Sequence, residues 1–512
     1  MQLIRLEREH VALFKNKKIY FITWFQNYVE EIYSIYPDFP VVSGGIDLKE
    51  RNQGFKEFHG VKVPIYGYDF LNNLPENSIL IITNGYFKEN YDEILSHGVS
   101  ENAGNVIYYY ANKDTKYYME YNDKYLDEKL KDIIVFRSGP AVSSYVYGMD
   151  YADNARALFE YMLLIKLNQK YKLVWFVKNP NDFKAIEDNN ENVSFISYDG
   201  AVSDDKNERD EYYEALCLAK YIFMTDAYGF CRYARNDQIR VQLWHGCGFK
   251  TRTVFSRCEH RYEYNIVISD LYKKIHKEIY GLRDDQVLIT GYPKEDWLYH
   301  PYTKWKEAFN IPDAQKYIFW LPTFRASVGQ LSELNETVPE GETGFPILYS
   351  EDDFGKLNSI LSRGNTEMVI KLHPFQNREA LSLGSYSNII LLDNDMIFDA
   401  GIQINELLGH ADALISDYSS VAVDYLQLDR PIGFTLDDVE EYEKNRGFVF
   451  DNIREWLPGV EIFSNEDFFS FVDEIIHRGD SSKEKRHIIA SLMHDFRDDQ
   501  SSRRVLEALD IY

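Results

Sequence analysis

The chain has 512 residues, more than a single hydrophobic core normally serves, so we expect two or three domains. Apolar residues make up 45% of it and aromatic residues 15%, which excludes general disorder. The 82 acidic and 56 basic residues give a net charge of −26. Because no run of Lys and Arg offsets this charge, we expect the chain to bind no nucleic acid.

The sequence also bears on localisation. Residues 1–8 mix acidic and basic side chains and lack the apolar core of a signal peptide. No stretch approaches the roughly 18 uncharged apolar residues that a transmembrane helix needs. We therefore expect a cytoplasmic protein, peripheral to the inner face of the cell membrane. The four cysteines lack the spacing of a zinc site and are predicted to be free thiols: Cys217, Cys231, Cys247 and Cys258.

Residues 1–132 are predicted to form a Rossmann-like accessory domain. Short apolar runs alternate with helical spacers, which is typical of a parallel α/β layer, and the expected strands are 18–22, 41–42, 61–63 and 79–82. The turn after the first of them reads Thr23-Trp24-Phe25-Gln26-Asn27 and contains no glycine. A dinucleotide requires glycine there, because the backbone must approach its pyrophosphate. We therefore expect this domain to bind no dinucleotide and to serve in docking or acceptor positioning.

Two further α/β domains are predicted, over residues 133–311 and 312–512. The expected strands of the first are 133–136, 173–176, 221–224, 241–244, 266–268 and 287–290, with a helical region at 154–167. Those of the second are 317–321, 368–372, 389–392, 413–415 and 432–434, followed by a helical region at 466–509. Segment 201–210 is predicted to be a surface loop, and segment 336–346 a mobile loop.

The first segment with chemical potential is Gln242-Leu243-Trp244-His245-Gly246. An apolar run precedes His245, so a strand would deliver this histidine to the carboxyl edge of a sheet, where ligands of α/β proteins bind. An imidazole at neutral pH can take a proton from an attacking hydroxyl, which makes His245 the best candidate for a general base. The alternative is a histidine that holds a loop by hydrogen bonds.

The second segment is Ser416-Asp417-Tyr418-Ser419-Ser420, between an apolar run and a helical one at 421–428. Exposed N–H groups and the dipole at a helix start favour phosphate, so this turn is built like an anion site. The alternative for Ser419 and Ser420 is plain helix capping, worth about 1 kcal/mol. Asp417 is expected to orient the turn. Candidate chemistry at strand ends of both domains implies a cleft between them, as in a GT-B transferase.

Eight segments in chain order resemble motifs of the CDP-glycerol glycerophosphotransferase family, whose members prime and polymerise teichoic acids and related phosphate-containing polymers. The resemblance covers roughly residues 133–506. The segments are Trp244-His245-Gly246 with Lys250-Thr251, Gly291 to Asp296, Leu321 to Arg325, Lys371 to Pro374, Asn405 to Leu408, Ser416 to Asp424, Asp429 to Pro431 and Arg446 to Phe448.

The resemblance implies a GT-B arrangement of two Rossmann-like domains, here with an additional N-terminal one, and no tightly bound cofactor or metal. It implies that His245 and His373 are catalytic, with His373 neutralising the leaving CMP; the alternative for His373 is a structural role. Arg325 offers a planar fork for phosphate, and Lys250 steers anionic substrate, although a surface arginine and a solvated lysine are the alternatives. The implied substrate-binding residues are Gly246, Lys250, Thr323, Arg325, Ser416, Asp417, Ser419, Ser420, Ser502 and Arg504.

The sequence departs from the family pattern at three places. Cys247-Gly248-Phe249 stands where the family has Thr-Pro-Leu, which bears on acceptor fit. Lys294-Glu295 replaces Arg-Asn, and residues 499–504 keep only part of the family's Asp-Gly-x-Ala-Ser-x-Arg ending.

The sequence therefore predicts a transferase that moves glycerol phosphate, or a related polyol phosphate, from a CDP-activated donor such as CDP-glycerol to a hydroxyl of a teichoic-acid-like or capsular polymer. The acceptor is expected to be lipid-linked, and a homo-oligomer is compatible with the sequence. A GT-B glycosyltransferase that uses a nucleotide sugar is the nearest alternative. A non-catalytic scaffold is the second, and the two strand-end histidines speak against it.

Overall fold

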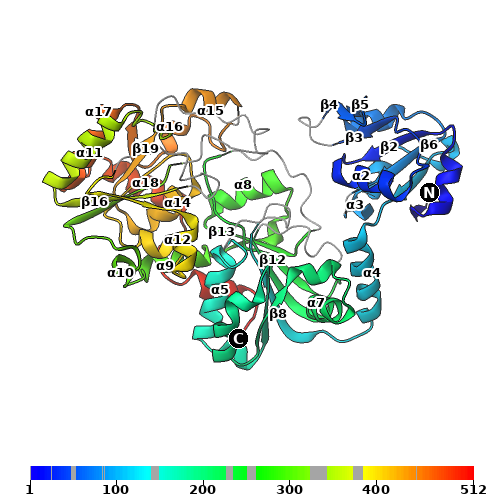
Figure 1. Cartoon of the computed structure of the whole chain (residues 1–512), viewed down its shortest axis with the longest axis horizontal. Coiled ribbons are helices and arrows are strands. Elements are labelled where there is room, and N and C mark those ends of the chain that lie inside the picture. Colours follow the sequence, from blue (N-terminus) through cyan, green and yellow to red (C-terminus); the bar gives the residue numbers. More distant parts are fainter. Residues whose placement is uncertain are drawn as a thin grey trace. The chain divides into compact units, whose positions relative to one another are not determined.

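The computed structural model describes residues 2–512 except 25, 48–52, 84, 86, 140–148, 226–234, 251–260, 323–342, 373–384 and 446. The chain divides into two compact units. The first consists of Met1–Lys129, Asp199–Cys217 and Gly229–Asn236, and the second of Leu130–Tyr198, Leu218–Tyr228 and Asp237–Tyr512. The predicted domain boundaries after residues 132 and 311 stay predictions, but each predicted domain contains one sheet (Figure 1).

The sheet of the first unit has seven strands in the order β1-β7-β6-β2-β3-β5-β4. Neighbours are parallel except for the hairpin of β4 and β5. The strands are β1 (Leu3–Arg5), β2 (Lys18–Ile22), β3 (Gly44–Ile46), β4 (Gly54–Phe58), β5 (Val61–Tyr66), β6 (Ser78–Ile82) and β7 (Val106–Tyr109). The helices of this unit are α1 (Arg8–Val11), α2 (Gln26–Ile35), α3 (Phe87–Ser96), α4 (Lys113–Tyr125) and α7 (Lys206–Leu218).

The strand predicted at 41–42 is wrong, because pairing with β2 begins at Gly44. A side chain on Gly45 would lie 2.8 Å from the ring of Trp24, so the pairing segment needs small residues that Val41 and Val42 do not provide. Trp24 itself, in the turn after β2, is buried and packs against Phe21 and Phe58. This tryptophan fills the turn in which a dinucleotide-binding domain carries glycine.

Helix α7 corrects a second prediction, since residues 206–210 belong to a helix and not to a loop. Its buried face is aromatic: the ring of Tyr213 stacks on that of Tyr121 of α4 at 4.7 Å, and Tyr121 donates a hydrogen bond to Asp210 at 2.7 Å. The polar run that suggested a loop thus includes the first five residues of this helix.

The second sheet has seven parallel strands in the order β10-β9-β8-β11-β12-β13-β14. This is the Rossmann order, in which the chain reverses direction across the sheet between β8 and β11. The strands are β8 (Lys131–Arg137), β9 (Lys172–Val177), β10 (Val193–Ser197), β11 (Ala219–Met224), β12 (Ile239–Gln242), β13 (Tyr264–Val267) and β14 (Val287–Ile289). Each of the six predicted strands corresponds to an observed one, although the strand predicted at 241–244 ends at Gln242, and β10 was missed.

The third sheet has six parallel strands in the order β17-β16-β15-β18-β19-β20, again with the Rossmann reversal, here between β15 and β18. The five predicted strands are confirmed, and β20 was missed. The strands are β15 (Lys316–Trp320), β16 (Thr366–Lys371), β17 (Ile389–Leu392), β18 (Ala413–Ser416), β19 (Ile432–Thr435) and β20 (Val460–Ile462).

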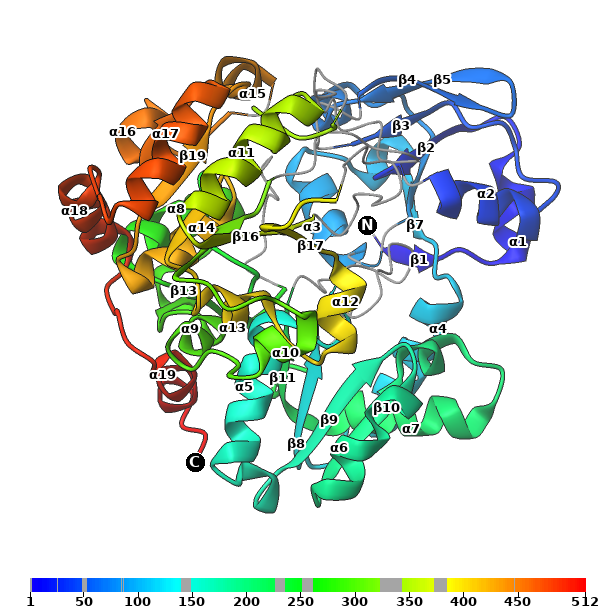
Figure 2. The same cartoon turned by 60° about the vertical axis from the view of Figure 1, so that its left-hand side comes forward.

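Helices cover these two sheets. Helices α11 and α17 lie side by side over one face of the third sheet, where they form an apolar cluster with β15, β16 and β18 (Figure 2). The other face shares one continuous core with the second sheet. The helices are α5 (Asp153–Leu164), α6 (Lys184–Asn189), α8 (Asp270–Tyr280), α9 (Asp296–Tyr299), α10 (Trp305–Phe309), α11 (Glu351–Arg363), α12 (Asn394–Asp399), α13 (Ile404–Leu408), α14 (Ser420–Tyr425), α15 (Val439–Asn445), α16 (Ile453–Trp456), α17 (Asn465–Ile476), α18 (Lys483–Met493) and α19 (Ser501–Ala508).

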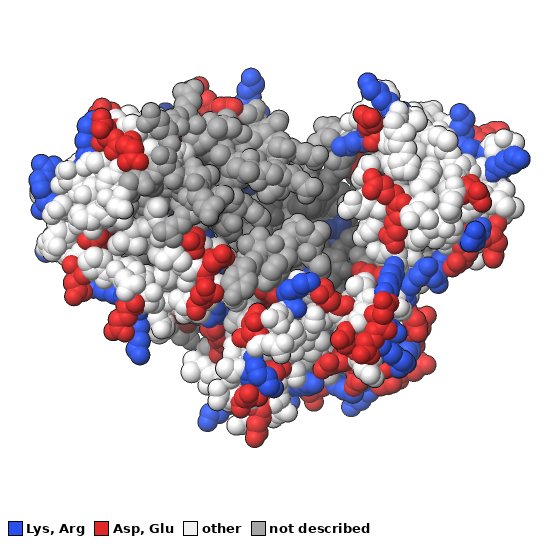
Figure 3. Space-filling view, viewed as in Figure 1, with Lys and Arg blue, Asp and Glu red and all other residues white. Residues whose placement is uncertain are grey.

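The surface mixes charges of both signs. On the face shown in Figure 3, acidic and basic side chains are interspersed over the described residues. No helix within the described ranges is both long enough and apolar enough to cross a bilayer. The predicted mobile loop at 336–346 lies largely outside the described residues.

Candidate functional site

The two segments with chemical potential both follow strands at carboxyl edges of the second and third sheets. Strand β12 ends at Gln242, so Leu243 and Trp244 separate the strand from His245, and the prediction of a histidine directly after a strand needs this correction. Strand β18 ends at Ser416, next to β15, where the strand order reverses. Ligands of open α/β sheets bind at such reversals.

The turn that carries His245 has an unusual backbone. Trp244 has φ 55° and Gly246 has φ 150°, both in the region that favours glycine. A tryptophan there is strained by about 1–3 kcal/mol and persists only where its surroundings hold it. Trp244 is buried, and the half-buried ring of His245 stacks on it at 4.4 Å. The strained turn therefore fixes one face of the imidazole.

Gly246 brings the two segments together. A side chain on Gly246 would place its Cβ 2.7 Å from Oγ and 2.9 Å from Cβ of Ser420. A Cβ on Gly248 would likewise lie 3.2 Å from Cβ of Ser420. The turn after β12 thus lies directly on the first residue of α14, and only glycine leaves room for this approach.

The serine turn itself follows β18 as predicted. Ser416 and Asp417 are buried, and the Ser416 hydroxyl donates to the carbonyl of Leu321, which follows β15, at 3.4 Å. Ser419 occupies the N-cap position of α14, and among the described residues its hydroxyl has no capping partner. The alternative that Ser419 merely caps the helix is therefore not supported by this geometry. Helix α14 is one and a half turns long and continues as a 3₁₀ turn over Leu426–Leu428.

Two buried side chains hold three successive carbonyls of the histidine turn. Asn154 Nδ2 donates to the carbonyls of Leu243, at 3.2 Å, and Trp244, at 2.9 Å. Lys294 Nζ donates to the carbonyl of His245 at 2.6 Å. The two side chains are connected, because the backbone N–H of Lys294 donates to Asn154 Oδ1 at 3.1 Å.

Lys294 also anchors buried charge. Its Nζ lies 3.0 Å from Asp424 of α14 and 3.7 Å from Asp153 of α5. Burial would lower the pKa of Lys294, but the two carboxylates hold it above the ordinary value. Burial raises the pKa of Asp424, and it raises that of Asp153 to about 6, with Lys294 opposing both shifts. Lys294 therefore links the histidine turn to the helix of the serine turn.

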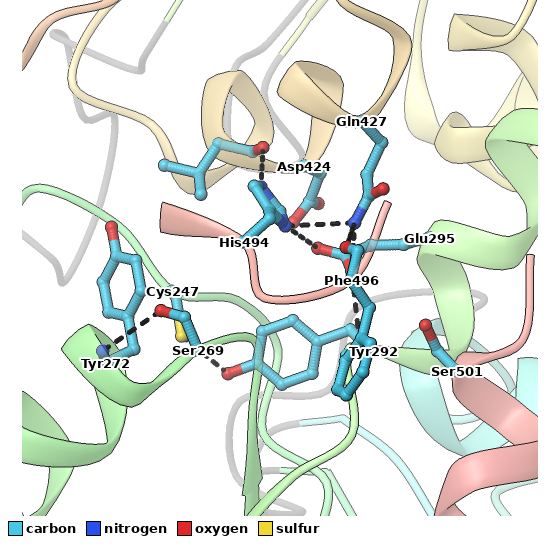
Figure 4. Close-up of polar contacts among 12 residues, drawn as sticks. Cys247, Ser269, Tyr272, Tyr292, Glu295, Asp424, Gln427, His494, Phe496 and Ser501 are labelled. Carbon is cyan, nitrogen blue, oxygen red and sulfur yellow. Dashed lines mark hydrogen bonds and ion pairs between the residues drawn. The ribbon is translucent and has the colours of Figure 1, made fainter. Parts of the chain in front are cut away.

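A second buried network lies beside this one (Figure 4). Gln427 Nε2 donates to Glu295 Oε2 at 3.1 Å and lies 3.0 Å from His494 Nδ1, while His494 Nε2 lies 2.9 Å from the Val423 carbonyl. Burial lowers the pKa of His494 to about 4, so its ring is neutral and donates through Nε2. Burial, together with the nearby Asp424, raises the pKa of Glu295 well above its usual range.

Cys247 occupies a third polar cluster, directly after the histidine turn. Its Sγ lies 3.1 Å from the hydroxyl of Tyr292 (Figure 4). The same Sγ lies 3.7 Å from Nε2 of His276, whose Nδ1 lies 3.0 Å from Asn265. Burial raises the pKa of the Cys247 thiol. A buried, protonated thiol is inert, so this cluster is a packing element beneath the turn. Cys217 is likewise a buried free thiol, and the other two cysteines lie outside the described residues.

Lys250 lies beside aromatic rings that pack on the serine turn, since Tyr442 and Phe448 both contact the ring of Tyr418. Lys250 pairs with Phe448, and its Nζ lies 5.5 Å above the ring of Tyr442. The described residues include no group of three or more His, Cys, Asp or Glu placed to hold a metal ion. Three predicted site residues fall outside the described residues: Thr323, Arg325 and His373.

The end of the chain engages its own fold. Asp296 accepts hydrogen bonds from the backbone N–H groups of Ser501 and Ser502, both at 2.8 Å, and so caps α19. Arg504 donates to the Thr290 carbonyl at 2.8 Å and to Asp498 at 2.8 and 3.0 Å. The predicted substrate role of Ser502 and Arg504 stays a prediction.

Sequence reasoning missed Asn154, and it noted Lys294 only as a departure from the family pattern. The charged run Lys294-Glu295-Asp296 gives no local sign that Lys294 is buried. No local signal marks Asn154, whose partners are distant in sequence.

Comparison with known proteins agrees with this geometry. Residues 126–510 match the family described as CDP-glycerol:poly(glycerophosphate) glycerophosphotransferase. The chain belongs to this family. Among curated members, it is 26% identical to the teichoic acid poly(glycerol phosphate) polymerase of Staphylococcus epidermidis over 380 residues, which cover 69% of this chain and 47% of the relative. It is 24% identical to the teichoic acid glycerol-phosphate transferase of Staphylococcus aureus over 408 residues, 74% of this chain and 93% of the relative.

The glycerophosphotransferase fold is also recognised in solved structures. The wall teichoic acid polymerase TagF superimposes with a TM-score of 0.58 at 21% identity, over 83% of this chain and 97% of that one. The predicted α/β class with parallel sheets is therefore confirmed. The teichoic acid poly(ribitol-phosphate) polymerase of Bacillus spizizenii is 27% identical over 405 residues, 73% of this chain and 57% of the relative. The chain thus spans about half the length of the first two curated polymerases.

Proposed function

We propose that the chain transfers glycerol phosphate, or a related polyol phosphate, from a CDP-activated donor to a hydroxyl of a teichoic-acid-like or capsular polymer and releases CMP. Family membership supports this reaction. The names of the curated relatives support a polyol-phosphate polymer, and TagF has been solved after a soak with CDPG. The observation that carries the proposal is the contact of Gly246 with Ser420, which brings the histidine turn onto the serine turn.

In this reaction His245 is the general base. The acceptor hydroxyl gives its proton to the imidazole while its oxygen forms a bond to the β-phosphorus of the donor. The bond between that phosphorus and the bridging oxygen breaks, and CMP leaves with the bonding electron pair. The pyrophosphate is held by Ser419 and Ser420 together with the Gly246 backbone, which stabilises the developing charge, while Ser416 and Asp417 shape the turn on the substrate-binding side.

Further parts of the proposal rest on the family resemblance. Thr323, Arg325 and His373 are assigned to the donor phosphates, and Lys250, Ser502 and Arg504 to substrate. The two Rossmann-type domains are assigned a GT-B arrangement, with residues 1–132 as a docking or acceptor-positioning domain. The acceptor is proposed to be lipid-linked and reached by peripheral membrane contact, the chain to work without a tightly bound metal, and a homo-oligomer is compatible with it.

Product analysis tests the reaction. The chain is incubated with CDP-glycerol, CDP-ribitol or a UDP-sugar and a polymer acceptor, and phosphorus NMR follows the nucleotide. We expect CMP and a new phosphodiester from one of the CDP-polyols. Release of a nucleoside diphosphate from the UDP-sugar would instead identify a glycosyltransferase, and no turnover with any donor would favour a scaffold.

Two variants test the base. His245→Ala should lower turnover by at least about 100-fold without unfolding, the usual contribution of a general base. His477→Ala is the matched control, because His477 is an exposed histidine at the end of α17 whose ring pairs with Asp473. Equal turnover of the two folded variants would refute the assignment of His245.

A further inference from the structure

The turn that carries His245 has a local hydrogen bond, from the Trp244 N–H to Gln242 Oε1 at 2.9 Å, and is also held through its carbonyls. Its three carbonyls, from Leu243 to His245, accept from Asn154 and Lys294. Asn154 is completely buried and Lys294 is 7% exposed, so neither side chain has room for other rotamers. The link between Asn154 Oδ1 and the Lys294 N–H makes the two side chains one rigid support.

The same support holds the strained backbone of Trp244, whose carbonyl accepts from Asn154. Trp244 is held at φ 55°, which a bulky residue adopts only where surrounding contacts over-determine it. On the far side Asp153, with φ 60°, is held by a hydrogen bond from its own N–H to Gln403 of the third domain at 3.1 Å. Lys294 therefore lies between two strained segments: the histidine turn with Trp244, and the start of α5 with Asp153.

Lys294 reaches the serine turn as well. Its Nζ pairs with Asp424 of α14 at 3.0 Å and lies 3.7 Å from the position of a Cβ on Gly246. A single ammonium group therefore contacts the turn of the second domain and the helix of the third. A lysine suits this place, because its three donors can point at a carbonyl and two carboxylates at once.

We propose that Asn154 and Lys294 form a clamp that positions His245 against the start of α14, and that Lys294 is the residue that registers the two domains at the site. The inference rests on the proposed function for its catalytic consequence. Both are positioning residues, since they act through the backbone of the turn and not on substrate. A buried hydrogen-bonded support of this kind fixes reacting groups to a fraction of an ångström, and a displacement of about 1 Å can lower a rate about 100-fold.

The test uses the full chain and five variants, four at buried charges and Asn154→Leu. Lys294→Met removes the ammonium and keeps the length of the side chain, whereas Lys294→Arg keeps charge and donors. The double variant Lys294→Met with Asp424→Asn also removes the carboxylate that the first change would leave buried without its partner. Arg486→Met is the matched control, because Arg486 is a fully buried cation paired with Asp429 and Asp480, away from the histidine turn.

Three quantities are measured on each variant: the thermal midpoint, the kinetics of CMP release, and hydrogen–deuterium exchange of the amides of residues 243–249. Lys294→Met should lose about 100-fold in kcat with little change in donor KM, and exchange should quicken in that segment. Lys294→Arg should recover most of both. The double variant should regain thermal stability but neither turnover nor slow exchange, and Arg486→Met should lose stability alone.

The outcomes separate the two proposals. If the double variant regains turnover together with stability, or if exchange of residues 243–249 is the same in Lys294→Met as in the wild type, the clamp is refuted. If wild-type chain releases no CMP from any CDP-polyol, the proposed function fails, and the exchange experiment still decides whether Asn154 and Lys294 hold the turn. Asn154→Leu should reproduce the exchange result of Lys294→Met, because it frees two of the three carbonyls.

Discussion

Substitution of Gly246 by alanine perturbs the point at which the two proposed halves of the site meet. An added Cβ would stand 2.7 Å from Oγ and 2.9 Å from Cβ of Ser420. The backbone of Gly246, at φ 150°, is moreover one that side-chain-bearing residues rarely adopt. The change therefore acts twice, through backbone strain and through overlap with α14.

Both contributions can be sized. A residue other than glycine in such a conformation costs about 1–3 kcal/mol. An extra methyl group in a packed interior costs about 1–3 kcal/mol unless the neighbours move. The sum, about 2–6 kcal/mol, is a large part of the stability of a typical domain. If the turn instead moves away from Ser420, stability is spared and the contact is lost, so that turnover falls.

The assay is urea unfolding together with CMP release for Gly246→Ala and Gly248→Ala. Gly248 is the matched control, because it approaches the same serine, at 3.2 Å, without a left-handed backbone. We expect Gly246→Ala to lose at least about 2 kcal/mol or most of its turnover, and Gly248→Ala to lose clearly less. A Gly246→Ala chain as stable and as active as the wild type would refute the close contact of the two turns.

Three shorter predictions follow from other contacts. Because burial raises the pKa of Asp153 to about 6, the folded state binds this proton more tightly than the unfolded state, so its contribution to stability is lost as pH rises from about 4 to 6. Urea unfolding at several pH values should show that the free energy of unfolding of the wild type falls by at most about 3 kcal/mol over this range. The Asp153→Asn variant should lack this fall. Arg504→Ala should destabilise the chain by about 2 kcal/mol through its contacts with Asp498, and donor KM, measured alongside, should rise only if Arg504 also binds substrate. Titration of the chain with NAD or FAD should show no saturable binding to the first unit, whose turn is filled by Trp24; binding there would overturn that reading.

The sheets were predictable because their signal is local. Apolar runs of four to six residues between polar helices marked all of the central strands of the second and third sheets. The missed strands are instead edge strands or short ones. Strand β10 lies at the edge of its sheet and is only partly buried, and β20 is an edge strand of three residues. The composition of both therefore differs little from that of a loop.

The site was predictable only in part, because its support is not local. The resemblance marked His245, Gly246 and Ser420, and the structure brings Gly246 and Ser420 into contact. It could not show that Asn154, about ninety residues earlier in the chain, holds the same turn. Such a contact depends on how α5 packs at the carboxyl edge of the second sheet, and it leaves no periodic signal in either segment.

The structure changes how residues 1–132 should be tested. A deletion at that boundary would leave α7 without its partner, since this helix belongs to the first unit although it follows β10 in sequence. Tyr213 of α7 is fully buried and stacks on Tyr121 of α4, and its hydroxyl donates to the Asp114 carbonyl. Uncovering such an aromatic face costs about 2 kcal/mol for each large side chain.

A chain of residues 130–512 should therefore bind more of a dye for apolar surfaces, and elute as larger species, than the full chain. A second truncation that also carries Tyr213→Gln should be better behaved, and transfer to a small soluble acceptor is then the proper measure of whether the accessory domain serves polymer docking. A monodisperse 130–512 chain with the dye binding of the wild type would show that α7 is supported without the first 129 residues. In that case the simple deletion remains a fair test of the docking role, because nothing but that role would have been removed.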